Sequence, residues 1–276
     1  MRSKGITSCV RAQTEMALSF PGEQLKTKKM PGHWVLARLG KRVLRPGGME
    51  LTRRLLTRLQ IMPTDEVVEF APGMGITARL TLQAQPASYT AVERDEAAAR
   101  IVTGYLRSQN QQCLVALASD TELPSASATV VYGEAMLTMQ PPETKREIIR
   151  EAARLLKRGG RYGIHEMCLL ADVEQRNDTK RNLTGVVHHG VSPLTIDEWQ
   201  SLLESEGLKV QTVDHAPMRL LEPSRIICDE GLFGTLRFGF NLMRDREARE
   251  RVLEMRAEFR RNRKKIGAVA ITAVKE

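Results

Sequence analysis

The chain has 276 residues, of which 42% are hydrophobic and 27% are charged, a composition typical of a globular protein with one sizeable core. Four scattered cysteines form no C-x-x-C pair and no zinc-ligand spacing, so we expect no structural metal, no disulfide framework and a cytoplasmic location. No apolar run approaches the ~20 residues that span a bilayer, and the formal net charge of +9 is spread along the chain, so it does not by itself indicate a nucleic-acid or membrane partner.

The first sixty residues divide into two parts. Residues 1–29 show no helical or strand period and contain the stretch GEQLKTKKMPG, which predicts a flexible segment. Further on, an RPGG breaker is followed by MELTRRLLTRL, in which leucines recur at helical spacing. We therefore expect a helical lid and a first helix over residues 30–60, at the start of a single domain that runs from residue 30 to residue 276.

Apolar runs and helix-length patterns alternate through the middle of the chain. Strands are predicted at 65–70, 88–93, 112–118, 128–133 and 161–166, and helices at 74–84, 94–108 and 141–160. Strands separated by helices imply right-handed crossovers and a parallel sheet that is covered on both faces. Residues 61–219 are therefore expected to form a doubly wound, Rossmann-like α/β core.

Two more strands are predicted toward the C-terminus, which brings the sheet to seven. TIDEWQSLLESEGLKVQTVDHA predicts a helix and a sixth strand, and KIGAVAITAVK, within residues 265–276, predicts the seventh. Between them lies a helical insertion, residues 220–264, with Phe240, Met243, Val252, Met255 and Phe259 on one face. This insertion either packs on the domain with a solvated charged face, or it offers its arginines and lysines to an anionic acceptor, a membrane surface or nucleic acid.

The stretch DEVVEFAPGMGITARL places a Pro-Gly-x-Gly turn directly after the first strand, where open α/β sheets contact phosphates or nucleosides. Gly73 and Gly75 let the backbone approach a ligand closely, and the next helix offers unpaired N–H groups. GMGITA, with Glu93 twenty positions beyond Gly73, also fits a dinucleotide fingerprint. Glu69 argues against a pyrophosphate, which a carboxylate would repel, and favours a cofactor with a cationic amino-acid tail, such as S-adenosylmethionine.

Several stretches in consistent order, from about residue 45 to 210, resemble the class I S-adenosylmethionine-dependent methyltransferases. VVEFAPGMG is similar to the family's acid-x-Gly-x-Gly-x-Gly loop, with Ala71 replacing the first glycine, a change that fits if residue 71 has a negative φ. YTAVERD and LASDTELP are similar to the segments that bind the ribose and the adenine, and ATVVYGEAML is similar to the fourth strand and its loop. The resemblance implies an antiparallel last strand and a set of cofactor-binding residues: Glu69, Ala71, Gly73, Gly75, Glu93, Arg94, Asp120, Thr121 and Gly133.

The segment GHWVLARLGKRVLRPGGMELT resembles the lid of the quinone-biosynthesis and related small-molecule methyltransferases, the methyltransferase type 11 group. This resemblance implies that Arg45, Gly47 and Gly48 border the methionine end of the cofactor. It also implies that Trp34 lines the acceptor pocket, although packing in the core would equally explain this side chain.

Candidates for a catalytic base lie at the carboxyl ends of the fourth and fifth strands or in the linker that follows. Methyl transfer is an in-line displacement at a sulfonium carbon, so alignment does much of the work, and a base is needed only when the acceptor keeps a proton. The histidines of GVVHHGVSPLT are preferred because the resembling family often builds its acceptor site there, and a structural role competes with catalysis for each. The candidates are Glu134, His165, Glu166, His188 and His189.

The resemblance implies S-adenosylmethionine-dependent methyl transfer (EC 2.1.1) to a small-molecule acceptor through oxygen, carbon or nitrogen, with S-adenosylhomocysteine as the product. A nucleic-acid partner is disfavoured because the fourth-strand loop reads YGEAML, not N-P-P-[YF] or D-P-P-Y, and aromatic residues make up only 4% of the chain. A non-catalytic cofactor-binding module and a nicotinamide-dependent oxidoreductase are two competing functions, and a homodimer is left open.

Overall fold

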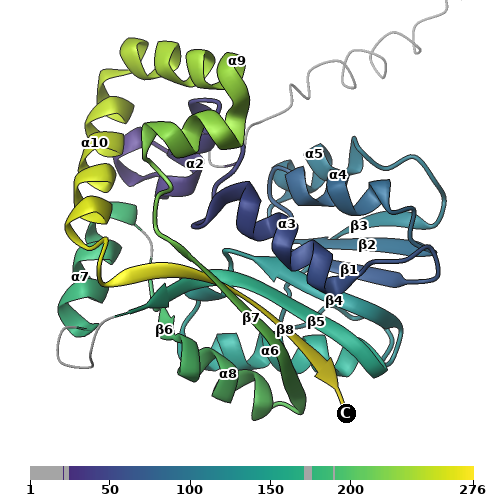
Figure 1. Ribbon diagram of the computed structural model, residues 1–276. Coiled ribbons are helices and arrows are strands. Elements are labelled where there is room, and N and C mark those ends of the chain that lie inside the picture. Colours follow the sequence, from purple (N-terminus) through teal and green to yellow (C-terminus); the bar gives the residue numbers. More distant parts are fainter. Residues whose placement is uncertain (1–20, 22–24, 171–175, 189) are drawn as a thin grey trace, which may run out of the picture.

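Mostly apolar strands, buried except at the two edges of the sheet, form one sheet at the centre of the molecule (Figure 1). The structure is a computed structural model that describes residues 21, 25–170, 176–188 and 190–276. The strand order is β3-β2-β1-β4-β5-β8-β7. Strands β1 to β5 run parallel, whereas β8 runs antiparallel to both of its neighbours. The strands are β1 (Glu66–Phe70), β2 (Ser88–Glu93), β3 (Gln111–Val115), β4 (Ala128–Glu134), β5 (Leu156–Leu169), β7 (Leu208–Pro217) and β8 (Ile266–Lys275).

Helices cover both faces of this sheet, because each has an apolar stripe that needs a partner. On one face α3 (Gly48–Leu59), α4 (Ile76–Gln83) and α5 (Glu96–Thr103) contribute to one buried cluster. On the other face α6 (Pro142–Leu155) and α8 (Ile196–Glu204) contribute to a second cluster, which contains the fully buried Trp199. The predicted doubly wound fold with an antiparallel last strand is therefore confirmed.

Three element predictions need correction. The helix expected at 141–160 ends at Leu155, because Leu156 already pairs with Ala128 and begins β5. The helix expected at 94–108 ends at Thr103. A two-residue strand, β6 (Leu194–Thr195), pairs with the end of β5 and makes the sheet eight-stranded; two residues are too short for any sequence period to reveal.

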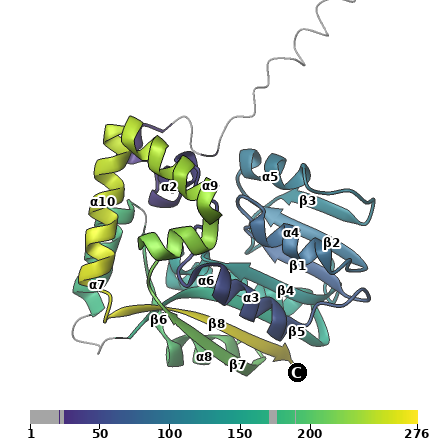
Figure 2. The same cartoon turned by 45° about the horizontal axis from the view of Figure 1, so that its top comes forward.

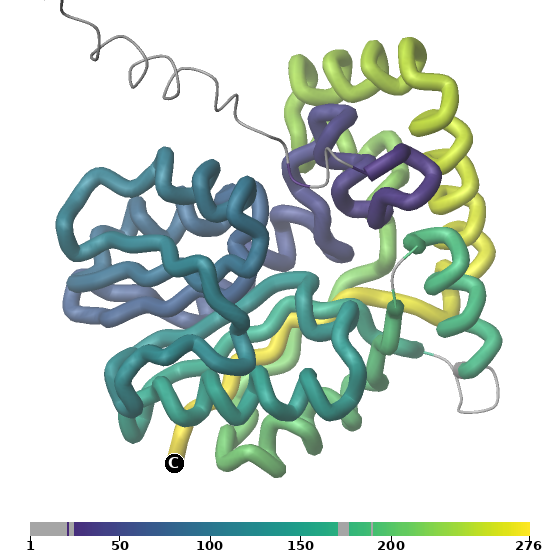
Figure 3. Tube along the Cα trace, turned by 180° about the vertical axis from the view of Figure 1, so that it is seen from behind, coloured from purple at the N-terminus to yellow at the C-terminus, as the bar shows by residue number. Residues whose placement is uncertain are grey.

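A layer of helices, which we call the helical cap, packs around a third buried cluster that also contains Met167, Leu169 and Ile266 of β5 and β8. The cap consists of η1 (Thr27–Lys29), α2 (Gly32–Arg38), α7 (Arg176–Val187), α9 (Pro223–Arg244) and α10 (Arg246–Arg261). Figures 1 and 2 show it on the side of the molecule away from α4 and α5, and Figure 3 shows η1 and α2 inside the hook formed by α9, α10 and α7. The cap therefore joins segments that are far apart in the sequence.

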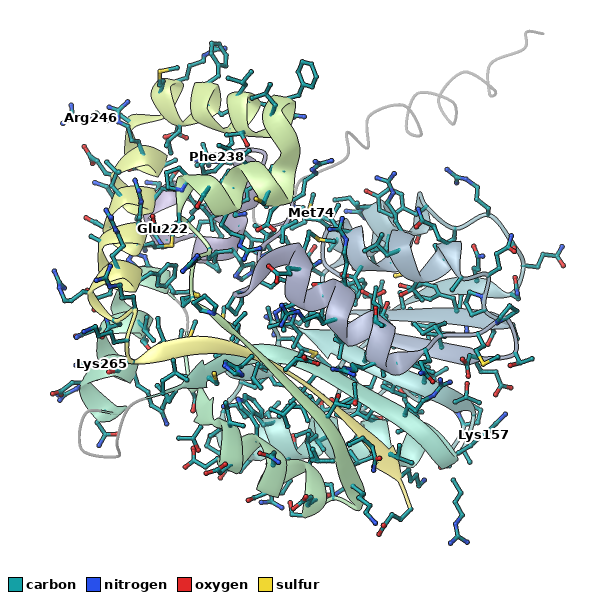
Figure 4. All side chains as sticks on the ribbon, viewed as in Figure 1. Met74, Lys157, Glu222, Phe238, Arg246 and Lys265 are labelled. Atoms are coloured by element: carbon teal, nitrogen blue, oxygen red, sulfur yellow. The ribbon has the colours of Figure 1, made fainter. Side chains whose placement is uncertain are left out.

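The predicted apolar face of the insertion is split between two helices. Asp245 ends α9 and caps α10 by accepting a hydrogen bond from the N–H of Ala248, so one continuous face cannot form. On α10, Val252, Met255 and Phe259 are buried in the cap. On α9, Phe238 points inward (Figure 4), whereas Phe240 and Met243 are exposed.

The loop between α2 and α3 is held by two carboxylates of α9. Glu230 Oε1 accepts hydrogen bonds from the N–H groups of Arg42 (2.9 Å) and Val43 (2.8 Å), and Asp229 Oδ1 accepts one from Met49 N (2.9 Å). The ammonium of Lys41, whose side chain is fully buried, lies 3.6 Å from Glu230 Oε1. Loop residues 40–48, which we call the lid loop, are therefore attached to the insertion.

Three further expectations concern the segment 1–29, membrane-spanning helices and metal sites. Of the segment 1–29, for which the sequence predicts flexibility, the structure describes residues 21 and 25–29, where Thr27 is buried, and the rest lies outside the described residues. Within the described ranges, no helix is both long and apolar enough to cross a bilayer. In that same part of the chain, no cluster of three or more His, Cys, Asp or Glu residues is arranged to hold a metal ion.

Candidate functional site

A cavity of about 330 Å³ lies between the carboxyl ends of the strands and the helical cap. Its sheet half is lined by the loops that follow β1, β2, β3 and β4, and its cap half by α2, the lid loop, the end of α7 and α10. Met74, labelled in Figure 4, lies on the part of the sheet half that faces the cap. This is the position at which open α/β sheets bind ligands.

The loop after β1 has the left-handed backbone that its glycines permit. Gly73 and Gly75 have φ values of 55° and 69°. A Cβ atom at Gly73 would meet nothing within 4 Å, whereas one at Gly75 would lie 2.5 Å from a ring carbon of Tyr105. Ala71 has a φ of 50°, so the condition under which we expected alanine to fit, a negative φ, is not met. Ala71 therefore adopts a left-handed backbone conformation, whereas L-amino acids ordinarily prefer a negative φ.

Glu93 joins the β1 loop to the end of β2. Its Oε2 accepts a hydrogen bond from Gly73 N and its Oε1 one from Asp95 N, both at 3.0 Å. Burial raises the pKa of Glu93, although the hydrogen bonds from these two backbone donors act to lower it. Glu93 lines the cavity, and since each carboxylate oxygen can accept more than one hydrogen bond, the group keeps capacity for a ligand's hydroxyls.

Glu69 lies at the floor of the cavity. Its Oε2 accepts hydrogen bonds from the hydroxyls of Tyr89 (2.5 Å) and Tyr132 (2.6 Å). Burial, reinforced by the nearby carboxylate of Glu134 and opposed by the two tyrosines, raises the pKa of Glu69 to about 7. The group is therefore poised to change charge near neutral pH, and a cation next to it would favour the ionised form.

Glu134, at the end of β4, is the centre of a buried network between the sheet and the lid loop. Its Oε1 accepts a hydrogen bond from Thr52 Oγ1 (2.6 Å) and lies 3.4 Å from Arg45 Nε and 2.8 Å from His165 Nδ1. Thr77 donates to its other oxygen. Burial by itself would raise the pKa of Glu134, but Arg45, His165 and Thr52 outweigh it and lower the pKa to about 2.

His165 is fully buried and does not line the cavity. Its Nε2 lies 2.5 Å from the carbonyl oxygen of Pro46, which can only accept a hydrogen bond, and its Nδ1 faces the carboxylate of Glu134. Both ring nitrogens therefore face acceptors. This geometry makes His165 a link between β5 and the lid loop, and a catalytic role for it stays a prediction.

Of the other two predicted histidines, His188 is described, and it does not line the cavity. His188 directly follows α7 with a φ of 53°, is exposed, and its Nδ1 lies 2.7 Å from the carbonyl oxygen of Lys28. The prediction for His189 lies outside the described residues. The linker that was expected to carry both contains a helix, α7, which turns His188 toward η1.

Glu166 is buried at the cavity wall and accepts hydrogen bonds from the backbone N–H groups of Met136, Leu137 and Thr138 and from the Thr138 hydroxyl. It therefore holds the loop after β4 in place, and four donors already occupy its two oxygens.

Of the remaining predicted cofactor residues, one lines the cavity and the others do not. Arg94 lines the cavity, whereas Asp120 is exposed, one residue beyond the lining Ser119. The N–H and hydroxyl of Thr121 both donate to Glu151. Gly48 and Gly133 line no part of the cavity, but a Cβ atom at Gly48 would lie 2.5 Å from Asp229 Oδ1, so that glycine permits the contact between α3 and α9.

Most of the cap half was not anticipated. Trp34 does line the cavity, as does Arg45. Beside them, sequence reasoning missed one imidazole and a set of apolar side chains: His33, Leu36, Met139, Met167, Val187, Val191, Met218, Leu220, Met255 and Phe259. The adjacent His33 could have been found together with Trp34, whereas the apolar residues carry no motif and are brought together only by the tertiary packing.

Comparisons with known proteins agree with this geometry. The family described as "Methyltransferase domain" matches residues 67–160, which contain β1 to β4 and their loops. An uncharacterized protein of Haemophilus influenzae is 33% identical over 248 residues, which cover 88% of this chain and 98% of that protein.

Similar solved structures share the fold at low sequence identity. The MccD protein has a TM-score of 0.66 at 16% identity and covers 84% of this chain and 99% of its own. The [4+2]-cyclase SpnF has 0.64 at 15%, covering 87% and 92%. Geranyl diphosphate C-methyltransferase from Streptomyces coelicolor A3(2), solved with Mg²⁺, geranyl diphosphate and S-adenosyl-L-homocysteine, has 0.61 at 16%, covering 83% and 78%.

The matched domain coincides with the strands whose loops carry the cavity's carboxylates. Residues 67–160 form a methyltransferase domain, and the chain shares its fold with solved methyltransferases.

Proposed function

We propose that this protein transfers the methyl group of S-adenosylmethionine to a small-molecule acceptor with a largely apolar surface, through an oxygen, carbon or nitrogen atom. The observation that carries the proposal is the contrast between the two halves of one cavity. The sheet half presents Glu69 and Glu93, whereas the cap half presents mainly aliphatic, methionine and aromatic side chains. Such a cavity suits a polar cofactor beside an apolar reactant.

The residues present fit the cofactor. Gly73 has open space where a side chain would stand, so a ligand can approach the loop backbone. Glu93 has fixed oxygens for ribose hydroxyls, and Glu69 places a carboxylate where a cationic amino-acid tail would be stabilised. Asp120 and Arg94 are proposed to contact the adenosine end. When bound, the cofactor supplies an electrophilic methyl group on a sulfonium centre.

The chain's own residues then enclose and orient the reactants. Trp34, Met255 and Phe259 bring apolar surface to the cavity and exclude water, which favours a close, aligned approach of the acceptor. Glu134 is held ionised by Arg45, so we propose that it positions the lid loop instead of taking a proton. His33 is the imidazole that lines the cap half, and we propose it as the proton acceptor for substrates that need one.

Two observations support a small-molecule acceptor over nucleic acid. The apolar cap half suits an apolar ligand, and two similar structures are named for methylation of geranyl diphosphate. A third is a cyclase, so the fold alone does not establish methyl transfer.

Titration calorimetry of the whole chain with S-adenosylmethionine, S-adenosylhomocysteine, NADH and NADPH tests the cofactor. We expect saturable binding of the two sulfur nucleosides and none of the nicotinamides; the reverse result overturns the proposal. A screen of small apolar acceptors with labelled S-adenosylmethionine then tests transfer. Binding without turnover on any acceptor would favour a cofactor-binding module, and tight, steeply salt-dependent binding of tRNA or duplex DNA would favour a nucleic-acid substrate.

A further inference from the structure

A second cavity, of about 440 Å³, lies between the connection from β7 to α9 and the C-terminal half of α10. Glu222, labelled in Figure 4, lies next to α10 and is the one carboxylate among the residues that line this cavity. Five cationic side chains line it as well: Arg219, Arg256, Arg260, Arg263 and Lys264. Its lining is therefore strongly basic.

Glu222 does not neutralise this charge. Its two oxygens lie 3.5 Å from Arg256 Nη2 and 3.2 Å from Arg260 Nε. Within the part of the chain that the structure describes, no ion pair joins Arg219, Arg263 or Lys264 to a carboxylate. Arg256 Nε is buried and has no hydrogen-bond acceptor there, which is a costly state for a guanidinium nitrogen.

Cations at the end of a helix have an ordinary explanation, since they stabilise its C-terminal carbonyl groups. That explanation covers Arg260 at the end of α10, but it does not cover Arg219, which comes from a separate segment, or the buried nitrogen of Arg256. Ser224, in the first turn of α9, also lines the cavity, and no side chain caps that helix. Donors from two segments therefore converge on one space.

We propose that this cavity binds the phosphate or diphosphate group of a ligand. Guanidinium groups hold phosphate oxygens with paired, charge-assisted hydrogen bonds, and several of them together suit a group that carries two or more negative charges. The site is distinct from the cofactor cavity, although Met218, Leu220 and Phe259 line both.

This shared wall connects the site to the proposed reaction. An anion that orders the side chains of the basic cavity would also fix the three apolar side chains that this cavity shares with the cofactor cavity. The inference goes beyond methyl transfer and does not depend on it, because phosphate binding can be measured without cofactor or acceptor.

The test is titration of the whole chain with sodium pyrophosphate at about 0.15 M salt, followed by calorimetry. We expect a dissociation constant below about 1 mM, as several charge-assisted hydrogen bonds would give. The double variant Arg219→Ala/Arg263→Ala should weaken binding at least tenfold, and since these exposed residues make no described ion pair, it should remain folded. Arg246→Ala, at the far end of α10, is the matched control and should bind as the wild type does.

Sedimentation with vesicles of phosphatidylglycerol distinguishes a lipid headgroup from a free phosphate. Binding of vesicles but not pyrophosphate, lost in the double variant, assigns the site to a headgroup, whereas the opposite pattern assigns it to a soluble ligand. The proposal is overturned if neither probe binds, or if the double variant and Arg246→Ala weaken binding equally, because that result would reflect net charge alone.

Discussion

The sheet and the helical cap build their halves of the cavity in different ways. In the sheet, each functional side chain lies at the carboxyl end of a strand, so neighbouring strands bring Glu69, Glu93 and Glu134 to one edge. In the cap, the lining comes from α2, α7 and α10, whose residues meet only after long stretches of chain have folded. The sheet half is therefore specified locally and the cap half by tertiary packing. We expect changes in the two halves to affect different quantities.

The largest expected effect is on the attachment of the cap. Lys41→Met would remove the buried cation next to Asp229 and Glu230, which would keep only Arg225 and Arg42 as described ion-pair partners. We expect it to lower the free energy of unfolding by about 3 kcal/mol in urea titrations. The double variant Lys41→Met/Glu230→Gln should recover part of this loss, because glutamine keeps the acceptor for Arg42 and Val43 without the charge. A loss below about 1 kcal/mol in the single variant would show that the cluster does not hold the cap.

Glu93→Ala tests the sheet half. Loss of the carboxylate removes the acceptor of Gly73 N and the proposed ribose contact, so calorimetry should show S-adenosylhomocysteine binding weakened by about 30-fold, equivalent to ~2 kcal/mol. The exposed Glu96, on the following helix, provides the control Glu96→Ala, which should bind as the wild type does. An affinity within twofold of the wild type in Glu93→Ala would contradict the assignment of the ribose site.

Trp34→Ala tests the cap half. We expect the KM for the acceptor to rise about tenfold while the affinity for S-adenosylhomocysteine stays within twofold. The reason is that Trp34 lines only the cap half of the cavity and not the sheet half. Steady-state kinetics and calorimetry measure the two quantities separately. If both change equally, the division of the cavity into two independent halves is wrong.

The raised pKa of Glu69 predicts a pH dependence that belongs to the sheet half. Below pH 7 the carboxyl is neutral and above it is ionised, so affinity for a cationic cofactor tail should rise up to about tenfold between pH 6 and pH 7.5. Without ligand the sign is opposite: the folded state retains a proton that the unfolded state has lost, so the free energy of unfolding should fall as pH rises from 4.5 to 7. Glu69→Gln should abolish both trends in paired titrations, and their persistence would point to another group.

The smallest expected effect concerns the loop after β1. Ala71→Gly removes the backbone strain of an alanine with a φ of 50°. We expect the free energy of unfolding to rise by only about 0.5 kcal/mol, because the greater freedom of glycine in the unfolded chain offsets part of this stabilisation. Ala97→Gly, in the first turn of α5, should lower it by about 0.5–1 kcal/mol. Equal signs for the two substitutions would contradict the strain at Ala71.

Sequence patterns predicted the sheet well because a buried parallel strand is a short apolar run and a turn at its end is marked by glycine, as in the stretch that contains Glu69 and Gly73. They predicted the cap poorly, because the burial of Met255 and the exposure of Phe240 depend on the break at Asp245 and on which helix is nearby. Likewise, nothing in the sequence tells which way His188 faces once α7 has formed, or that Ala71 accepts a positive φ.

The lid loop is attached on both sides, to α9 through Glu230 and to the sheet through Arg45 and Pro46. A motion that widens the cavity can therefore take one of two forms. Either the lid loop moves with α9, which separates Arg45 from Glu134, or the lid loop stays on the sheet, which breaks its hydrogen bonds to α9. In the first case, admission of a ligand also removes the cation that keeps Glu134 ionised. Access and electrostatics would then change in a single step, and the opening rate would depend on ionic strength and pH as well as on temperature.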